Sequence, residues 1–354
     1  MPLAFLLLFL AACDPLHTGF SDLEPAVYYQ REKSTVQPFR STLTVMTWNL
    51  KFAGGRIDFF FDCHGNQVLM SHAEVLQHLE GLAAKIRQVD PDLLFLQEAD
   101  VSSKRSAYVD TVRWLLEHTS LQYGVYASQW KADFVPSDGL GKVDSGNAIL
   151  SRWPLAEATR HALPLIEEQS ELTSYFYLKR NILAATLTLP DGRPLRLANT
   201  HAEAYAKDGT KQRQLERFKA LLDTYTEDGE LFVAGGDLNT LPPGAKKTKD
   251  FPDSVCTGTY EADDFSAEGA YLSDFFTDFE AAIPLTAYLA DEKSFFTHST
   301  SGEEFWNRTL DYLFAPAGTF VEGSGLVHQD EAHGEWATMP LSDHAPLSVE
   351  VRLP

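Results

Sequence analysis

The sequence predicts an α+β fold in which two β-sheets lie between layers of helices. Apolar strands alternate with amphipathic helices along most of the chain, and Asp191-Gly192 supplies the tight turn of a hairpin within 182–201. The segment 92–98 is apolar along nearly its whole length, which is typical of a strand buried on both faces. Such strands require sheets that are covered on both sides.

The order of elements follows from local patterns. Ser71 and Glu74 match a capping box, and apolar residues from Val75 to Val89 then recur at helical spacing. Residues 242–300 have the least regular pattern and are expected to carry long loops. The expected strands span 43–52, 92–98, 122–128, 146–155, the two arms of 182–201, 230–239, 309–316 and 345–353, and further helices span 102–119 and 210–226.

The N-terminus reads MPLAFLLLFLAACDP, an apolar run that stops at Cys13 and is too short for the roughly 20 residues of a membrane span. The residues Leu10 to Cys13 resemble a bacterial lipobox, although no Lys or Arg precedes the run. This resemblance implies a signal peptide over 1–12, lipidation of Cys13, and attachment to a bacterial membrane outside the cytoplasm. An ordinary cleaved signal peptide is the alternative.

Two further regions are expected. Residues 13–41 lack clear periodicity and contain three prolines, so they are interpreted as a lipid-anchored tether with a loosely docked arm. Residues 42–354 contain no obvious linker and are expected to form one domain. The two remaining cysteines, Cys63 and Cys256, either form a disulfide or stay as free thiols.

The charge of the chain bears on its partners. The 354 residues carry a formal net charge of −21. Binding along a nucleic-acid backbone depends on Lys and Arg that neutralise phosphates, so this balance opposes it. A locally positive site on an acidic surface remains compatible with the composition.

Polar residues close most of the predicted strands. Any one of them could cap a turn or pair at the surface, but their recurrence at strand ends indicates a functional site, because strand ends are where folds present reactive groups. The residues concerned are Asn49, Glu98, Asn199, His201, Asp237, Asn239, Asp311, Asp343 and His344.

The residue types at these strand ends indicate a chemistry. Carboxylates and amides are hard oxygen ligands that suit Mg²⁺ or Mn²⁺ better than Zn²⁺. The histidines remain for phosphate contacts and proton transfer. Oxygen-ligated metal with imidazole and amide groups favours phosphoester hydrolysis.

Seven motifs together resemble the endonuclease/exonuclease/phosphatase superfamily over about residues 43–353. In chain order they are TWNLKF, LLFLQEAD, GNAILSRWP, ANTH, GGDLNT, RTLDYLF and LSDHAPL. The resemblance implies a four-layer α/β/β/α sandwich, with helices outside two mostly antiparallel sheets packed face to face. It also implies a divalent-metal-dependent hydrolase that cleaves a phosphodiester or monoester.

The resemblance also implies roles for single residues. His344 looks like the general base, which takes a proton from water, and Asp311 like the acid that orients its imidazole. The metal ligands implied are Glu98, Asn49 and Asp343. Asp237 resembles the carboxylate near the attacking water or the leaving oxygen, and Asn239 and His201 resemble donors to the phosphoryl oxygens.

Some positions keep two readings. Arg180 is either a phosphate contact or a surface arginine, and Asn147 either faces the site or caps a bulge. Tyr126 is interpreted as a core or cross-strand residue, and the aromatic loop 59–62 as filling the space beneath itself. Surface or structural roles are expected for the remaining histidines that match no motif, which are His64, His72, His78, His161, His298, His328 and His333.

The expected function is therefore phosphoester hydrolysis by general-base activation of water, with Mg²⁺, or plausibly Mn²⁺, as cofactor. The substrate could be a phospholipid head group, a nucleotide, a sugar phosphate or nucleic acid. A secreted nuclease and a non-catalytic ligand-binding lipoprotein on the same scaffold are the alternatives. No protein partner is evident from the sequence, and a monomer attached to the membrane by its lipid is expected.

Overall fold

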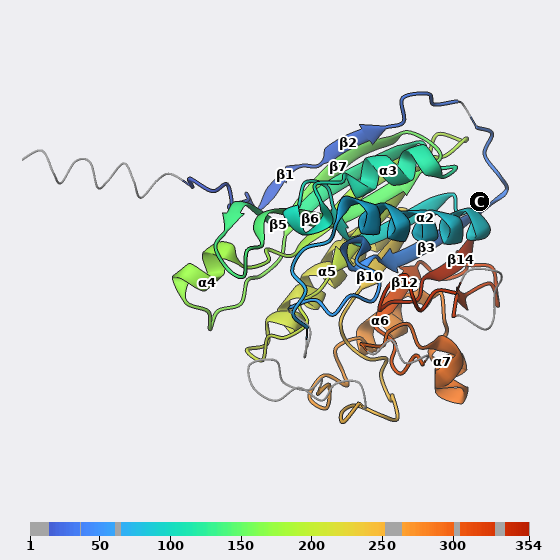
Figure 1. Cartoon of the computed structure of the whole chain (residues 1–354). Helices are drawn as coiled ribbons and strands as arrows, with labels where there is room; N and C mark the ends of the chain where they lie inside the picture. Colours follow the sequence, from blue (N-terminus) through green and yellow to red (C-terminus); the bar gives the residue numbers. More distant parts are fainter. Residues whose placement is uncertain are drawn as a thin grey trace, which may run out of the picture.

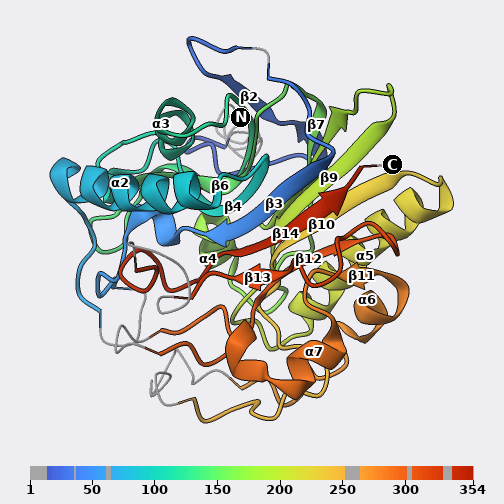
Figure 2. The same cartoon turned by 90° about the vertical axis from the view of Figure 1, so that its right-hand side faces the viewer.

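The computed structural model describes residues 14–35, 37–60, 65–251, 264–300, 305–329 and 337–353. Within these residues the chain forms two seven-stranded sheets that pack face to face, with helices against their outer faces (Figures 1 and 2). The predicted sandwich is therefore confirmed. Cys13, Cys63 and Cys256 lie outside the described residues, as do the expected signal peptide, lipidation site and disulfide.

One sheet contains the first predicted strand. Its order is β13 (Leu326–Val327), β14 (Leu347–Arg352), β3 (Thr42–Asn49), β4 (Leu93–Asp100), β6 (Gly141–Ser151), β5 (Tyr123–Val135) and β2 (Val27–Gln30). The pair β3 and β4 is parallel, and its other neighbours are antiparallel.

The second sheet contains the predicted hairpin. Its order is β1 (Leu23–Pro25), β7 (Leu155–Ala162), β8 (Asn181–Thr188), β9 (Pro194–His201), β10 (Leu231–Asp237), β12 (Asp311–Ala315) and β11 (Glu280–Ala281). Here β9 and β10 are parallel, and the other pairs are antiparallel. Each sheet is thus mixed, with a single parallel pair among the described strands.

Helices cover the outer faces because their apolar sides pack there. The helix α2 (His72–Val89) begins at the predicted capping box, in which Ser71 and Glu74 bond each other's backbone. It packs with α3 (Thr111–His118) against the β3–β4–β6 sheet. On the other side, α5 (Thr210–Glu227) and α6 (Ser273–Asp278) pack against β9, β10 and β12. The other short helices are η1 (Lys51–Ala53), η2 (Lys104–Ser106), α4 (Glu171–Phe176), α7 (Leu285–Ala290) and η3 (Glu292–Phe295).

The core between the sheets is mainly apolar, and amide side chains hydrogen-bond across it. Val45, Phe95 and Val233 belong to its fully buried apolar cluster. Across this layer Gln97 Nε2 donates to Asn199 Oδ1 at 2.7 Å, and Asn199 Nδ2 donates to backbone carbonyls of β4 and β6 at 2.8 and 2.9 Å. Asn199, a residue expected among the reactive strand ends, therefore ties the two sheets together.

The N-terminal arm differs from the expectation of loose docking. Within 13–41, β1 pairs with β7 in one sheet and β2 pairs with β5 in the other. The two short strands lie at sheet edges, where a residue such as Pro25 does not interrupt a ladder on both sides. These strands are too short for an alternation of apolar and polar residues to be recognised in the sequence.

Other differences concern element limits. The helix expected over 102–119 is α3, which begins only at Thr111 behind the N-cap Asp110, because residues 104–106 form a separate helical turn. The strand β7 was not predicted. No helix in the described part of the chain is both long and apolar enough to cross a membrane.

Candidate active site

The predicted polar strand ends gather at one edge of the sandwich because of strand direction. The parallel pairs β3–β4 and β9–β10 finish at this edge, and the antiparallel strands β12 and β14 begin there. The register places Asp237 beside both His201 and Asp311, and His344 precedes β14. Segments far apart in the sequence thus meet here. Trp48 Nε1, for example, donates to the backbone carbonyl of His344, 296 positions away, at 2.8 Å.

His344 and Asp311 form a buried pair. His344 Nδ1 lies 2.8 Å from Asp311 Oδ2, and both side chains are almost inaccessible to solvent. The backbone of His344 is held by the Ser342 hydroxyl at 3.1 Å. The geometry leaves Nε2 of the imidazole facing Asp237, 3.5 Å from Oδ2 of that carboxylate. An acid that fixes one imidazole nitrogen orients the other for proton transfer.

Asp237 is the centre of the group. Its Oδ2 atom lies 3.0 Å from Asn49 Nδ2, 3.4 Å from His201 Nε2 and 3.5 Å from His344 Nε2. Its Oδ1 atom accepts from the backbone N–H of Asn239 at 3.0 Å. The carboxylate therefore links side chains from both sheets.

Glu98 and Asp343 face a second part of the site. Glu98 lies at a bulge in β4, with a positive φ of 54°, and Asn49 Nδ2 donates to its Oε1 at 3.2 Å. Asp343 Oδ2 lies 3.7 Å from the buried Lys51 ammonium. Bulges next to strand ends commonly re-aim one side chain, and here the bulge turns Glu98 toward the site.

Burial and neighbouring charges shift the pKa values of Glu98 and Asp343 in opposite directions. Burial and the neighbouring Asp343 raise the pKa of Glu98. Burial also raises the pKa of Asp343, but Lys51 and His344 outweigh it and hold that pKa below its usual value. A buried carboxylate whose pKa is raised by burial and by a neighbouring carboxylate, as at Glu98, is the kind of group that a divalent cation stabilises in its charged form.

A second group could also be considered for a cation. Asp237, Asp311 and His344 each offer a ligand atom within 4.8 Å of the others. In this group, however, the Asp311–His344 hydrogen bond already occupies one carboxylate oxygen and one imidazole nitrogen. The oxygen donors Glu98 and Asp343 therefore fit a hard divalent cation better, and the Asp311–His344 pair fits proton transfer better. Asn49 lies beside them, and its Oδ1 accepts from the Lys51 backbone N–H at 3.0 Å.

Burial and charge set the protonation of the imidazoles. Burial opposes a charge on His344, but Asp311 and Asp237 outweigh it and raise its pKa. Burial raises the pKa of Asp237, and Asp311 adds to this rise. His201 is the opposite case, because burial and the nearby Arg180 depress its pKa well below the usual value. His201 is therefore neutral at pH 7.

A pocket opens beside Glu98 and Asp343. Arg180, Arg105 and Lys51 supply three buried cations to its lining, against the acidic balance of the whole chain. Arg180 Nε and Nη1 have no hydrogen-bond partner among the described residues, and the nearest carboxylate oxygen, of Glu203, is 3.7 Å from Nε. The other lining residues are Phe52, Phe59, Gln129, Trp130, Ser145, Tyr177, Leu178 and Tyr205. Arg180 is thus buried at the pocket and is not a surface arginine.

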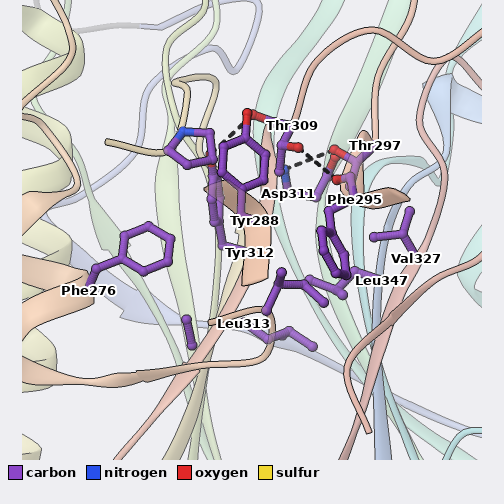
Figure 3. A pocket seen from close by; sticks show the side chains of 13 residues that line it. Phe276, Tyr288, Phe295, Thr297, Thr309, Asp311, Tyr312, Leu313, Val327 and Leu347 are labelled. Atoms are coloured by element: carbon purple, nitrogen blue, oxygen red, sulfur yellow. Dashed lines mark hydrogen bonds between the residues drawn. The ribbon is translucent and has the colours of Figure 1, made fainter. Parts of the chain in front are cut away.

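A smaller pocket lies behind Asp311. Thr297 Oγ1 accepts from the Asp311 backbone N–H at 3.3 Å, and apolar side chains such as Leu313 and Leu347 form other walls (Figure 3). Asp311 Oδ1 is buried and has no hydrogen-bond partner in the described part of the chain.

The structure places the remaining predicted residues as follows. Asn239 Nδ2 donates to the Ala202 carbonyl at 3.0 Å at the rim of the site. Asn147 donates to Asn181 between the sheets and does not line the pocket. Tyr126 is a buried cross-strand residue, as expected, with its hydroxyl 2.7 Å from Asp144 Oδ1. In the aromatic loop, Phe59 packs on Phe52 with ring centroids 4.7 Å apart and also lines the pocket.

Several residues of the site were not found from the sequence. The ring of His298, expected to be structural, lies edge-on to His344 with centroids 4.5 Å apart. Burial and Arg308 depress the pKa of His298 well below its usual value. No sequence motif identifies Lys51 and Arg105 as buried cations. Only Lys51 could have been connected with the site, because it lies two residues after Asn49.

The fold resembles solved structures of distant sequence. An endonuclease/exonuclease/phosphatase from Beutenbergia cavernae has a TM-score of 0.57 and 20% identity, over 89% of this chain and 72% of that chain. The catalytic domain of human Nocturnin has a TM-score of 0.52 and 16% identity, over 93% of this chain and 98% of that chain. At these identities the similarity establishes the fold alone.

Sequence comparison adds a curated relative and a family. An inositol phosphosphingolipids phospholipase C from Schizosaccharomyces pombe is 24% identical over 190 residues. That match spans 51% of this chain but only 40% of the relative. The sequence pattern of the Endonuclease/Exonuclease/phosphatase family matches residues 46–344, which include Asn49 and His344 and all the strands between. The chain therefore belongs to the Endonuclease/Exonuclease/phosphatase family.

Proposed function

We propose that the protein is a divalent-metal-dependent phosphoesterase that hydrolyses a phosphodiester or phosphomonoester with water. One observation carries the proposal: the oriented Asp311–His344 pair lies beside Asp237, and Asn49 donates both to Asp237 and to Glu98, so the pair and the carboxylates share one edge of the sandwich. The family supports the reaction class, since endonucleases, exonucleases and phosphatases all cleave phosphoesters. A non-catalytic binding protein would not need the oriented imidazole.

The proposed cofactor is Mg²⁺, with Mn²⁺ as a substitute. Glu98, Asp343 and Asn49 would hold it, because they are the hard oxygen donors of the site that the Asp311–His344 pair does not use. When bound, such a cation polarises a phosphoryl oxygen and offsets its negative charge.

His344 is the proposed general base. Its Nε2 takes a proton from water while the water oxygen bonds to phosphorus, and the bond from phosphorus to the ester oxygen breaks. The departing oxygen takes a proton from solvent and leaves as an alcohol, and the His344 imidazolium then returns its proton to solvent. Asp311 holds the ring through Nδ1 and stabilises the imidazolium that forms, and Asp237, 3.5 Å from Nε2, orients the attacking water.

Three donors are proposed to bind the phosphoryl oxygens. His201 is neutral, so its Nε2–H donates without carrying a charge into the buried site. Asn239 has a second amide hydrogen beyond the one given to Ala202. Arg180 has unpaired N–H groups at the pocket. Donors aimed at growing negative charge are typically worth about 2.7–4 kcal/mol of barrier each.

A lipid phosphoester is the preferred substrate class. The relative from Schizosaccharomyces pombe is named for action on inositol phosphosphingolipids. The net charge of −21 counts against a nuclease that follows a nucleic-acid backbone. We also propose lipidation at Cys13, residence outside the cytoplasm on a bacterial membrane, and action as a monomer. Mass spectrometry of the mature N-terminus tests the first of these.

The activity is tested with bis- and mono-p-nitrophenyl phosphate, with Mg²⁺ and with a chelator. Hydrolysis should require the cation and should fall by about 10²–10⁴-fold in His344→Gln. His161→Gln is the matched control. His161 lies on β7, and among the described residues its side chain has a hydrogen bond with Thr159 at 3.0 Å and none with the site. The proposal would be refuted if hydrolysis were equally fast with Mg²⁺ and with chelator. It would also be refuted if His344→Gln and His161→Gln lost the same activity.

A further inference from the structure

Residues 14–18 are fastened to the body of the protein beside the active-site pocket. Tyr175 of α4 donates its hydroxyl to Asp14 Oδ1 at 2.5 Å. The Asp133 backbone N–H donates to the Leu16 carbonyl at 2.9 Å, and His17 Nδ1 lies 2.7 Å from the Asp133 carboxylate. The segment is therefore held between α4 and the end of β5.

The elements that hold this segment also form a wall of the pocket. Trp130 of β5 donates to the Phe176 carbonyl at 2.8 Å, and the Lys179 N–H donates to the Gln129 carbonyl at 2.6 Å. These bonds fix the residues after α4 against β5. Tyr177 and Leu178 lie between them and line the pocket together with Gln129 and Trp130.

Arg160 makes a second connection between the arm and the pocket wall. Its guanidinium carbon lies 4.0 Å from the Phe20 ring centroid. The same guanidinium donates to the Lys179 carbonyl at 2.8 Å and to the Ser128 carbonyl at 3.0 Å. The buried Arg160 side chain therefore joins the arm to the residues that follow α4 and to β5.

Docking of residues 14–18 against the domain determines how a lipid on Cys13 would orient the domain at a membrane. If residues 14–41 were a flexible tether, their ends would lie roughly 30 Å apart and the domain could take any orientation. In the structure Asp14, the residue that follows Cys13 in the sequence, is already docked against α4. An acyl chain there would leave the protein beside α4 and the pocket.

Apolar side chains are exposed at the same place. Leu172 is 72% exposed and lies one helical turn from Tyr175, on the same side of α4. Phe134 is 56% exposed and follows Asp133 in β5. We call Phe134 and Leu172 the anchor-side surface. They belong to β5 and α4, two elements that are labelled in Figure 1.

We propose that the anchor-side surface rests on the lipid bilayer, and that the pocket takes its phosphoester from the head groups of that same membrane. The inference rests on the proposed phosphoesterase function and on lipidation at Cys13. Exposed carboxylates around the surface, which include Asp133, Glu167 and Glu171, disfavour strongly anionic lipid. The fitting partner is therefore a bilayer rich in zwitterionic phospholipid.

The test uses the full lipidated chain in vesicles of phosphatidylethanolamine and phosphatidylcholine. Phosphorus-containing products released from the vesicle lipids are compared with hydrolysis of soluble bis-p-nitrophenyl phosphate. The variant Phe134→Glu/Leu172→Glu should lower lipid hydrolysis by about tenfold or more, the factor that corresponds to losing burial of one leucine-sized side chain. Its soluble activity should stay unchanged.

The matched control is Leu326→Glu, because Leu326 is also exposed but lies on β13, at the opposite edge of its sheet from β2. That variant should keep both activities. Contact is measured directly by brominated-lipid quenching of added tryptophans, with wild type subtracted. Leu172→Trp should be quenched and Leu326→Trp should not.

The outcomes separate this inference from the proposed function. If no form hydrolyses the soluble ester, the proposed function fails, and quenching still decides which surface meets the membrane. If the soluble ester is hydrolysed but no vesicle lipid is, the membrane substrate is excluded. The proposed orientation of the anchor-side surface on the bilayer would be overturned by either of two results. One is equal lipid hydrolysis by Phe134→Glu/Leu172→Glu and Leu326→Glu, and the other is equal quenching of Leu172→Trp and Leu326→Trp.

Discussion

Asp311 Oδ2 lies 2.8 Å from Nδ1 of His344, although the two residues are 33 positions apart and enter from different sheets. The bond leaves Nε2 of His344 as the nitrogen that faces Asp237, where water must be activated in the proposed mechanism. The carboxylate both aims the ring and raises its pKa.

Asp311→Asn should lower kcat/KM by about 10²–10⁴-fold, because it weakens the general base. It should also shift the pH profile. His344 acts in its neutral form, which becomes populated as pH rises through its pKa. Removing the Asp311 charge lowers that pKa, so the acidic limb of the profile should move to lower pH.

The measurement is kcat/KM for bis-p-nitrophenyl phosphate from pH 5 to 10 with saturating Mg²⁺. A variant with the same limb as wild type, or with a limb moved to higher pH, would contradict an ion pair between these residues. Asp278→Asn, an exposed change on α6, is the control for a nonspecific charge effect.

Glu98→Gln should stabilise the protein in chelator and abolish its response to Mg²⁺. A carboxyl group whose pKa is raised in the folded state disfavours folding at pH values above its usual 4.5, where the unfolded group is ionised. The neutral amide avoids this cost, so the gain should grow as pH rises above 4.5.

Thermal unfolding with and without Mg²⁺ checks the Glu98 prediction. Wild type should gain about 2.7 kcal/mol at a concentration of 100 times Kd, and the variant should gain almost nothing. A variant that is less stable than wild type in chelator would show that the carboxylate is satisfied by protein groups alone.

Arg180→Lys should lower kcat/KM by about 10–100-fold, because one charge-assisted hydrogen bond to a phosphoryl oxygen is worth about 1.5–3 kcal/mol. Lysine keeps the charge but loses the planar fork of donors. Steady-state kinetics supply the measurement. Arg196→Lys is the control, since Arg196 pairs with Glu157 and Glu230 at the surface, and it should leave kcat/KM unchanged.

Asn199→Ala should destabilise the protein by about 2–4 kcal/mol, because it leaves the amide of Gln97 and two buried carbonyls without their partner. Urea unfolding monitors this loss. Asn239→Ala, at the rim of the site, should instead lower activity with little change in stability. The reverse pattern would assign Asn199 to the chemistry and Asn239 to the scaffold.

Gly236→Ala should prevent folding. Gly236 has a φ of 127°, and an added Cβ would meet the Thr200 carbonyl oxygen at 2.0 Å and the Asn199 amide at 2.9 Å. Gly192→Ala is the matched control, because Gly192 has a φ of 87° but open space around it. That change should cost only about 1–2 kcal/mol. Soluble expression and circular dichroism of both variants distinguish the two cases.

The amino-acid sequence determined the elements and the kinds of polar group at their ends. Two features depend only on neighbours a few residues away, the capping box at Ser71 and Glu74 and the turn at Asp191-Gly192. The interactions that form them can therefore be recognised in the local sequence. Buried strands are apolar throughout, which makes a polar residue at a strand end conspicuous. For these reasons the sandwich and the residues Asn49, Glu98, Asp237, Asp311 and His344 could be predicted.

Only the tertiary structure decided which polar residues have partners. Asn199 and His201 are two positions apart on β9, yet Asn199 ties the sheets together while His201 faces Asp237. The buried cations Lys51 and Arg105, and His298 beside His344, are set by contacts with distant segments. Whether a charged side chain is buried depends on the distant groups that surround it in the fold. The local sequence pattern does not identify those groups.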